Sequence, residues 1–528
     1  MNIASTQFVL FAIAAVALYY VFPKKFRWIS LLFANVAFYL FAGAEMILYV
    51  IGAAAVAYFA GTAMSKLFDE QKEKQEGLER KEKKEIKAVY TKKRKRILTL
   101  AIVVVLLGLA VVKYAGFMVE NINALLGIVG VGSLGVSGKQ VSEFIPTVVG
   151  CSYFTLMVIS YVTDVYRGKI KAEKNFIKVF VYLSFFPHIT MGPIERYDHI
   201  APQIFEGNKF EFSNIKTGAM LVMWGFFKKL IITDRLAVIT ASIFGGYEDL
   251  NAIAVMFGLV LFSIQIYTDW TTYCDIVGGV AEMMGIKITQ NFSQPNFSKT
   301  MPEFWRRWHM SMGAFFKDYV LYPISTSNFC LKLNKGSRKV FGKTGGKIIS
   351  SALPILSVWF LTGLWHGASW NFMMWGLFQG VIIMLSVTFS PMLEKVNTKL
   401  NFKTETFSWS LFRMGRTFLL CCLGRIFFKS ATLTDAFGMF SRLTVFSGGF
   451  DPFSFGLDKK DLFVAIVGVI ILLAYDIFEE KGISVRKTLD KQPIIVKWLI
   501  LYAVIMFIVI YGYYGADVQH TTFVYGNF

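Results

Sequence analysis

The sequence predicts an all-α membrane protein that crosses the bilayer many times. Of its 528 residues, 55% are hydrophobic and only 17% are charged, whereas soluble globular proteins carry about 25% charged residues. The mean hydropathy is +0.52. Aromatic residues make up 16% of the chain, including 52 Phe, which suits a lipid-facing surface with aromatic belts at both interfaces.

The apolar runs predict the membrane helices, because a helix needs about 20 mainly apolar residues to cross the hydrocarbon core. We expect spans at about 5–22, 28–44, 46–64, 97–117, 141–163, 218–233, 252–273, 348–367, 370–390, 408–428, 461–478 and 494–514. Two weaker runs lie near 176–191 and 430–446. The pattern predicts about 11 to 13 crossings. It shows neither an internal repeat nor a low-complexity linker, so we expect a single membrane domain over 1–528.

The positive charges orient these spans. The formal net charge is +20, and the cations lie between the apolar runs rather than along one face. This favours cytoplasmic loops that contact anionic lipid over a nucleic-acid interface. A basic insertion at 66–96 is expected to form a largely helical cytoplasmic hairpin or tail, and 331–347 carries six cations and no acid. Placing the basic segments inside puts both termini outside and makes 118–140, rich in small residues, an external loop.

Several chemistries have no sequence support. The chain has no P-loop, no G-x-S-x-G elbow, no H-E-x-x-H helix and no dinucleotide fingerprint, which argues against ATP-driven transport and metalloprotease chemistry. The five cysteines are odd in number and irregularly spaced, so we expect neither a disulfide framework nor a metal site.

The first candidate catalytic residue is His366. It lies in Trp365-His366-Gly367, inside the 46-residue stretch 348–393, which contains no Asp, Glu, Lys or Arg. An imidazole is costly in so apolar a run unless something uses it, and its pKa near neutrality lets it accept a proton. One interpretation is a solvated histidine in an aromatic belt. The other is a general base in an apolar pocket, which takes the proton of an attacking hydroxyl.

The second candidate is His309, in the segment Met301-Pro302-Glu303-Phe304-Trp305-Arg306-Arg307-Trp308-His309. Pro302 suits the first position of a helix, and Glu303 suits its first turn. The mixture of apolar and cationic residues is typical of an amphipathic helix at the membrane interface. Alternatively, the arginines form a cation cluster for a phosphate-bearing donor, and His309 lies in the same cavity.

A third segment, 184–197, contains Pro187, His188, Gly192 and Pro193, which prevent a continuous helix. Irregular backbone at membrane depth must line a cavity or be covered by protein. The intramembrane acid Asp269 is expected to pair with a cation or polar group, or to take part in the chemistry.

A further segment, 361–371, runs from Leu361 through Trp365-His366-Gly367 to Asn371. Together with 184–197 and the His309 segment, it resembles the membrane-bound O-acyltransferase family. The polysaccharide O-acetyltransferase branch is the most similar, and the C-terminal 523–528 resembles the aromatic tail of that branch. D-alanyl transferases of teichoic acid are a second branch.

The resemblance implies a ring of tilted helices around a central tunnel, with short interfacial helices. It implies that His366 is the catalytic histidine and that His309 occupies a second catalytic position, which holds Asn, Asp or His across the family. Trp305, Arg306 and Arg307 are candidates for donor binding. Candidates for lining the cavity are Pro187, His188, Gly192, Pro193, Asp269, Trp365 and Asn371.

The implied reaction moves an acetyl group from a cytoplasmic thioester, acetyl-CoA or an acyl carrier, to a hydroxyl acceptor outside. It needs no tightly bound cofactor and no metal. The implied setting is a bacterial inner membrane. The implied partners are glycan synthesis machinery and an extracytoplasmic acetyltransferase or esterase-like protein. The C-terminal tail is a candidate contact for that protein. Acyl transfer to teichoic acid, a transporter or lipid flippase, and a nonenzymatic scaffold for a glycan synthase remain alternatives.

Overall fold

The computed structural model describes residues 3–145, 148–401 and 403–514, which form helices joined by turns and loops, with no strand among them. The all-α prediction is confirmed. The chain folds as two compact units. Unit 1 comprises Met1–Lys216 and Val280–Thr289, and unit 2 comprises Thr217–Gly279 and Gln290–Phe528. The single membrane domain expected from the sequence stays a prediction.

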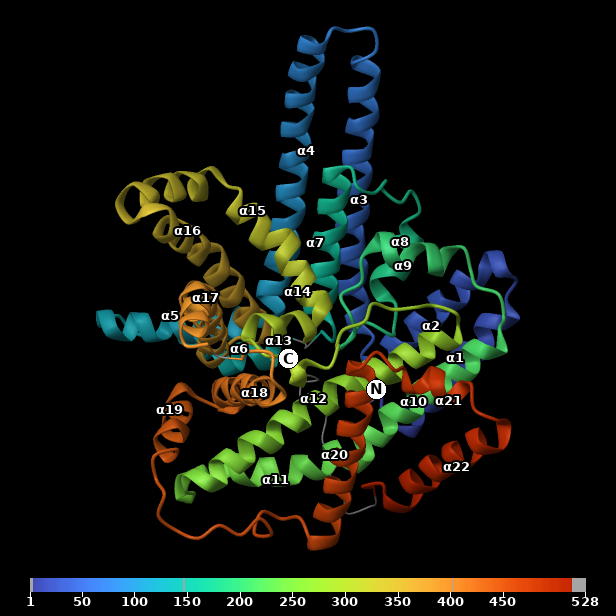
Figure 1. The fold of residues 1–528 in the computed structure, drawn as a ribbon. Helices are drawn as coiled ribbons and strands as arrows, with labels where there is room; N and C mark the ends of the chain where they lie inside the picture. Colours follow the sequence, from blue (N-terminus) through green and yellow to red (C-terminus); the bar gives the residue numbers. More distant parts are fainter. Residues whose placement is uncertain (1–2, 146–147, 402, 515–528) are drawn as a thin grey trace. The chain divides into compact units, whose positions relative to one another are not determined.

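Unit 1 is built on a long helical hairpin (Figure 1). Its helices are α1 (Thr6–Val21), α2 (Arg27–Ala42), α3 (Glu45–Lys74), α4 (Arg80–Leu109), α5 (Ala115–Val129), α6 (Gly138–Phe144), α7 (Cys151–Arg167), α8 (Phe176–Ser184) and α9 (Tyr197–Phe205). Helices α3, α4 and α7 pack against one another. A π-helical turn, Ala110–Tyr114, joins α4 to α5.

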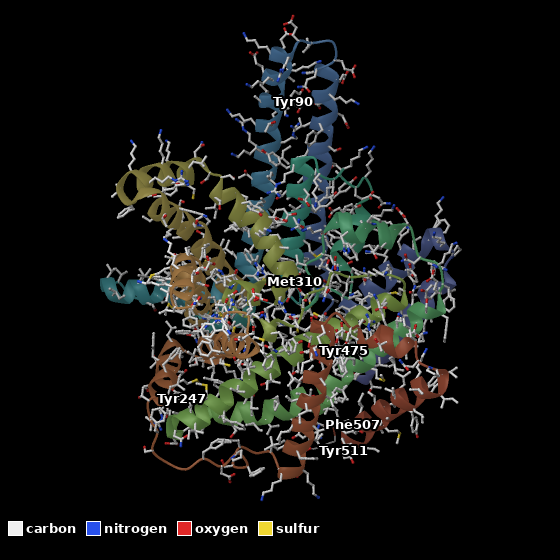
Figure 2. The ribbon with its side chains drawn as sticks, viewed as in Figure 1. Tyr90, Tyr247, Met310, Tyr475, Phe507 and Tyr511 are labelled. Carbon is white, nitrogen blue, oxygen red and sulfur yellow. The ribbon has the colours of Figure 1, made fainter. Side chains whose placement is uncertain are left out.

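The basic insertion at 66–96 forms the connected ends of α3 and α4, as the sequence predicted (Figure 1). Gly77 takes a left-handed φ of 74° in the turn. Glu79 caps α4 through a capping box with Glu82, which satisfies two backbone amides at the start of the helix. Tyr90, labelled in Figure 2, is buried on α4 beneath the ammonium groups of Lys74 and Lys93.

Two predictions in unit 1 were wrong. The expected external loop at 118–140 is mostly helical, because the apolar residues up to Val129 continue α5 and the isolated Gly127 does not interrupt it. Gly130, left-handed, ends α5, and the Ser137 capping box starts α6. The expected span 141–163 is divided between α6 and α7, and left-handed Gly150 stands before α7.

Unit 2 contains the remaining helices. They are most of α10 (Phe212–Phe227), then α11 (Asp234–Gly245), α12 (Ala252–Met283, to Gly279 in this unit), α13 (Met301–Arg307), α14 (Met310–Phe316), α15 (Tyr322–Ser325), α16 (Asn328–His366), α17 (Trp370–Lys399), α18 (Phe407–Lys429), α19 (Leu433–Arg442), α20 (Lys459–Glu480), α21 (Val485–Asp490) and α22 (Ile494–Tyr511). A π-helical turn, Lys228–Thr233, joins α10 to α11.

Helices α16 and α17 form an antiparallel hairpin with very close backbones. Gly376 lies against the carbonyl oxygen of Trp359, and Gly363 against that of Phe372. A side chain at either glycine would force the helices apart, which is why small residues stand at this crossing. The hairpin turn at 367–369 therefore holds the end of α16, where His366 is the last residue, firmly against α17.

Aromatic stacking joins α10, α20 and α22. Trp224 stacks on Phe227, with ring centroids 5.0 Å apart, and on Tyr475 at 4.4 Å. Phe507 approaches Phe227 at 6.1 Å and Tyr511 at 5.0 Å. Figure 2 labels Tyr475, Phe507 and Tyr511 on these helices.

Seven helices in the described part of the chain are long and apolar enough to cross a membrane, and α1 is a shorter apolar helix. The seven stretches are Met46–Lys74, Arg80–Val129, Ala252–Met283, Asn328–His366, Trp370–Lys399, Lys459–Glu480 and Ile494–Tyr511. The chain is a multi-pass membrane protein. The higher number of crossings and the central tunnel stay predictions.

Candidate active site

His309 lies at a sharp bend between two short helices of unit 2. The sequence predicted one interfacial helix through this region, but α13 ends at Arg307 and α14 begins at Met310, which Figure 2 labels. His309 itself takes a left-handed conformation, φ 46° and ψ 55°. This conformation costs a residue other than glycine about 1–2 kcal/mol and requires support from its surroundings.

Two backbone hydrogen bonds to the segment 291–293 hold the bend at His309 in this conformation. The amide of Met310 donates to the carbonyl oxygen of Asn291 at 2.9 Å, and the amide of Ser293 donates to the carbonyl oxygen of Arg307 at 3.0 Å. The first turn of α13 is also capped, because the Thr300 hydroxyl accepts from the amide of Glu303. Pro302 stands at the second helical position, after Met301, and not at the first as predicted.

Asn291 determines which nitrogen of His309 carries the proton. The Asn291 Oδ1 accepts from the backbone amide of Ser311 at 3.2 Å, which identifies this atom as the oxygen of the amide group. His309 Nδ1 lies 3.0 Å from the same oxygen. Because that oxygen can only accept, Nδ1 carries the hydrogen and Nε2 keeps its lone pair.

His309 is 0% exposed, and its Nε2 has no hydrogen-bond partner among the described residues. Its ring packs edge-on against Trp270 of α12, with centroids 4.4 Å apart. Burial lowers the pKa of His309, which lies outside the candidate spans, to about 3. The imidazole is therefore neutral, and its Nε2 offers a hydrogen-bond acceptor.

A cavity of about 270 Å³ borders His309. Trp305 and Arg306 line it from α13, Trp308 lines it from the position after that helix, and Trp359 and Thr362 line it from α16. Most of the lining is apolar, as in a typical small-molecule pocket in which a few polar groups fix the ligand.

His366 lies one helical turn beyond this wall. It follows Thr362 by four residues on α16, so the two side chains lie on one face of the helix. The His366 ring is 2% exposed and lies among Trp365, Trp375 and Phe428, at centroid distances of 5.0, 4.9 and 5.6 Å.

Trp365 connects the two histidines. Its ring lies 5.9 Å from that of His309 and 5.0 Å from that of His366. Because both imidazoles are buried among aromatic rings, neither is a solvated residue of an interfacial belt, and His309 also borders the cavity.

The two arginines of α13 are placed differently. Arg307 forms ion pairs with Glu303 at 2.9 Å and with Glu480 at 2.6 Å. Arg306 lines the cavity, and no ion pair engages it within the described ranges. Trp305 also lines the cavity and donates to Gln379 Oε1 at 3.3 Å. Of the three donor-binding candidates, Arg306 and Trp305 are therefore in contact with the cavity.

The other candidates are dispersed. Asp269, buried on α12, lies 3.0 Å from the Lys229 ammonium, as expected of an intramembrane acid. Asn371 donates to the carbonyl oxygen of Ser430 at 2.7 Å, and so fastens the start of α17 to the end of α18.

Pro187, His188, Gly192 and Pro193 belong to unit 1 and are buried in the irregular segment between α8 and α9. The His188 ring packs edge-on against Phe185 at 5.4 Å.

Known proteins are similar to this chain over much of its length. The sequence model described as MBOAT, membrane-bound O-acyltransferase family, matches residues 137–342, which include His309 and the 187–193 segment. A protein of Pseudomonas syringae pv. tomato named "Probable alginate O-acetylase AlgI" is 29% identical over 81% of this chain and 72% of its own length. The chain is similar to the membrane-bound O-acyltransferase family over residues 137–342, and to proteins named as alginate O-acetylases over most of its length. It is an O-acyltransferase, as the sequence predicted.

Relatives with other names match a shorter part of this O-acyltransferase. The peptidoglycan O-acetyltransferase of Helicobacter pylori is 26% identical over 54% of the chain and 54% of its own length. The teichoic acid D-alanyltransferase of Bacillus subtilis is 26% identical over 53% of the chain and 68% of its own length.

Sequence reasoning missed the residues that hold the histidines in place. Asn291 stands 18 residues before His309 and has no motif around it. Trp270 and Phe428 come from α12 and α18, far from either histidine in the sequence. Only the fold brings these side chains together, so no local pattern could have identified them.

Proposed function

We propose that this O-acyltransferase moves an acetyl group from acetyl-CoA to a hydroxyl of an exported or cell-surface polysaccharide. The names of the relatives support the acetyl group and the glycan, since the alginate O-acetylases match most of the chain. The observation that carries the chemistry is the buried imidazole of His309 at the cavity, with its Nε2 kept as an acceptor by Asn291 and with the buried His366 on the other side of the Trp365 ring.

In the proposed mechanism His366 is the general base. It takes the proton of the acceptor hydroxyl as the oxygen attacks the thioester carbonyl. The tetrahedral intermediate collapses, the C–S bond breaks, and the thiolate takes the proton from the imidazolium of His366. The apolar walls exclude water and so limit hydrolysis of the donor. General-base catalysis of this kind contributes about 10²–10⁴ in rate.

His309 orients a reacting group rather than removing a proton. Its Nε2 accepts a hydrogen bond, and this is the property shared by the Asn, Asp and His that the family resemblance implies at this position. Arg306 and Trp305 bind the donor, whose phosphates suit the guanidinium at the cavity. Arg307 stabilises α13 through its two carboxylate partners.

We also propose the setting in which this reaction takes place. The donor enters from the cytoplasmic side of a bacterial inner membrane, and both termini face outward, as the distribution of Lys and Arg predicts. An extracytoplasmic acetyltransferase or esterase-like protein completes the transfer to the glycan. The proposed contact for it, 523–528, lies outside the described residues.

The test is mass spectrometry of cell-surface polymers from cells that express His366→Ala at normal membrane levels. We expect acetyl esters to fall by at least about a hundredfold. Undiminished acetylation would exclude His366 as the base. D-alanyl esters in place of acetyl esters on the wild-type polymer would instead assign the chain to teichoic acid modification.

A matched pair of variants tests the role of His309. His309→Asn keeps a hydrogen-bond acceptor and should retain activity within about tenfold of wild type. His309→Ala removes the acceptor and should lose about 10- to 100-fold, the equivalent of 1.4–2.7 kcal/mol. If both variants are equally inactive, His309 acts as a base and the proposed division of roles is wrong.

A further inference from the structure

A second and larger cavity lies between α17 and α18, with Thr300 and Met301 at the start of α13 also in its lining, and neither histidine lines it. Its volume is about 1210 Å³, above the roughly 300–1,000 Å³ of ordinary small-molecule pockets. Three cations and one acid, Lys403, Arg413, Arg416 and Glu394, face it, a net charge of +2. We call it the α17–α18 cavity.

Its two arginines are poorly neutralised. They lie three residues apart on α18 and therefore on one face of that helix. Arg416 donates to the backbone carbonyl of Lys299 at 3.0 Å. Within the described ranges, neither arginine forms an ion pair with a carboxylate. Arg413 is half-buried and Arg416 is exposed, so both guanidinium groups are accessible to a ligand in the cavity.

The lining changes from polar to apolar along the cavity. Asn397, Asn401 and Lys403 line it near the α17–α18 connection, whereas Ile382 and Leu420 line it farther along the two antiparallel helices. The arginines lie between these ends, about 9 and 14 Å along α18 from its first residue, Phe407, at 1.5 Å per residue. The gradient matches an amphiphile with an anionic head and hydrocarbon chains.

The apolar wall is accessible from the side. Leu385, Phe389 and Leu393 of α17 line the cavity and are 44%, 48% and 52% exposed. They belong to a helix that is long and apolar enough to span the membrane. Hydrocarbon chains could therefore pass from the cavity into the bilayer, whereas a water-soluble donor would be exposed to lipid along this wall.

We propose that the α17–α18 cavity binds an anionic phospholipid, with its phosphate on Arg413 and Arg416 and its acyl chains along α17. Basic pockets between membrane helices on the cytoplasmic side commonly bind anionic headgroups. The connection beside this cavity carries Lys395, Lys399 and Lys403, and the charge pattern predicts that it is cytoplasmic. The site is independent of the acyl-transfer chemistry.

Native mass spectrometry of the full chain in detergent tests the proposal, with phosphatidylglycerol and phosphatidylethanolamine as probes. We expect wild type to retain phosphatidylglycerol preferentially. Arg413→Gln/Arg416→Gln should weaken that binding at least about tenfold, because hydrogen bonds to charged groups are lost. The matched control, Lys395→Gln/Lys399→Gln, removes the same charge from exposed residues beside the cavity and should bind as wild type does.

Two further measurements keep the test decisive. Arg413→Lys/Arg416→Lys retains the charge and should retain phosphatidylglycerol, which separates loss of the site from loss of the fold. Coenzyme A is the competing probe. Equal lipid retention by the Gln variant and wild type would overturn the proposal, and so would displacement of the lipid by coenzyme A, which would make the cavity a donor site.

Discussion

Replacing Asn291 by Leu should disable the site without touching either histidine. The substitution removes the acceptor of three hydrogen bonds, from His309 Nδ1 at 3.0 Å, from the Ser311 amide at 3.2 Å and from the Ser311 hydroxyl at 2.9 Å. Asn291 is 3% exposed, so water does not easily replace it. A buried donor left unsatisfied costs about 1–3 kcal/mol.

The cost at His309 determines the expected loss of activity. Without the Asn291 side-chain oxygen, either nitrogen of the ring can carry the proton, and the Ser311 amide beside the bend loses its acceptor, while the backbone hydrogen bond from Met310 remains. A cost of about 1–3 kcal/mol at this residue corresponds to a loss of about 5- to 150-fold in rate. The assay is acetyl transfer by membrane vesicles, normalised to the amount of protein.

Ser311→Ala is the matched control. It removes the hydroxyl that reaches Asn291 but leaves the His309 hydrogen bond and the Ser311 backbone amide in place. We expect its activity to stay within about threefold of wild type, since a neutral hydrogen bond typically contributes about 0.5–1.5 kcal/mol to stability. Full activity in Asn291→Leu, or an equal loss in Ser311→Ala, would refute the role given to Asn291.

Two other predictions concern the α16–α17 hairpin and unit 1. Gly376→Leu should reduce acyl transfer at least about tenfold, because the new side chain separates α16 from α17 and displaces His366. Gly415 on α18 has open space around it, so Gly415→Leu is the control and should keep its activity. Equal activities of the two variants would contradict this prediction. The hydrogen bond that His199 Nδ1 donates to the Glu195 carboxylate raises the pKa of His199 above its ordinary 6.5. Thermal stability in detergent should therefore fall as pH rises from about 6.5 through the raised pKa, and Glu195→Gln should remove this component.

The sequence predicted the helices well because hydropathy and length decide them in a membrane. Where small residues interrupted an apolar run, the prediction was less accurate. Gly127 lies inside α5, whereas Gly130 ends it, and the two differ in backbone conformation rather than in local composition.

The candidate site was predicted in part. His309, Trp305 and Arg306 were identified from one motif, and the structure brings them to one cavity. The bend at His309 was not predicted, because a left-handed residue other than glycine depends on tertiary support, here the pairing with Asn291 and Ser293. Periodicity carries no information about such support.

A cluster of buried charges that includes Asp269 of α12 gives a last prediction, since Trp270 of the same helix packs on His309. The most apolar window of α12 is 72% buried, against 22% for α16 and 33% for α17. Asp269 precedes Trp270, which packs on His309. The Lys229 ammonium lies 3.0 Å from Asp269 and 3.0 Å from Asp234, and all three side chains are at most 3% exposed.

Lys229→Met should therefore be strongly destabilising, because it leaves two carboxylates buried without their cation. Breaking a buried ion pair by removing one partner costs about 3–5 kcal/mol. Melting in detergent should show the loss, and acyl transfer should fall with it as Trp270 shifts against His309. Lys229→Met/Asp269→Asn removes one of the two stranded charges and should recover part of the stability. If the single variant melts as wild type does, α12 is not held by this charge cluster, and the support it gives to His309 must come from packing alone.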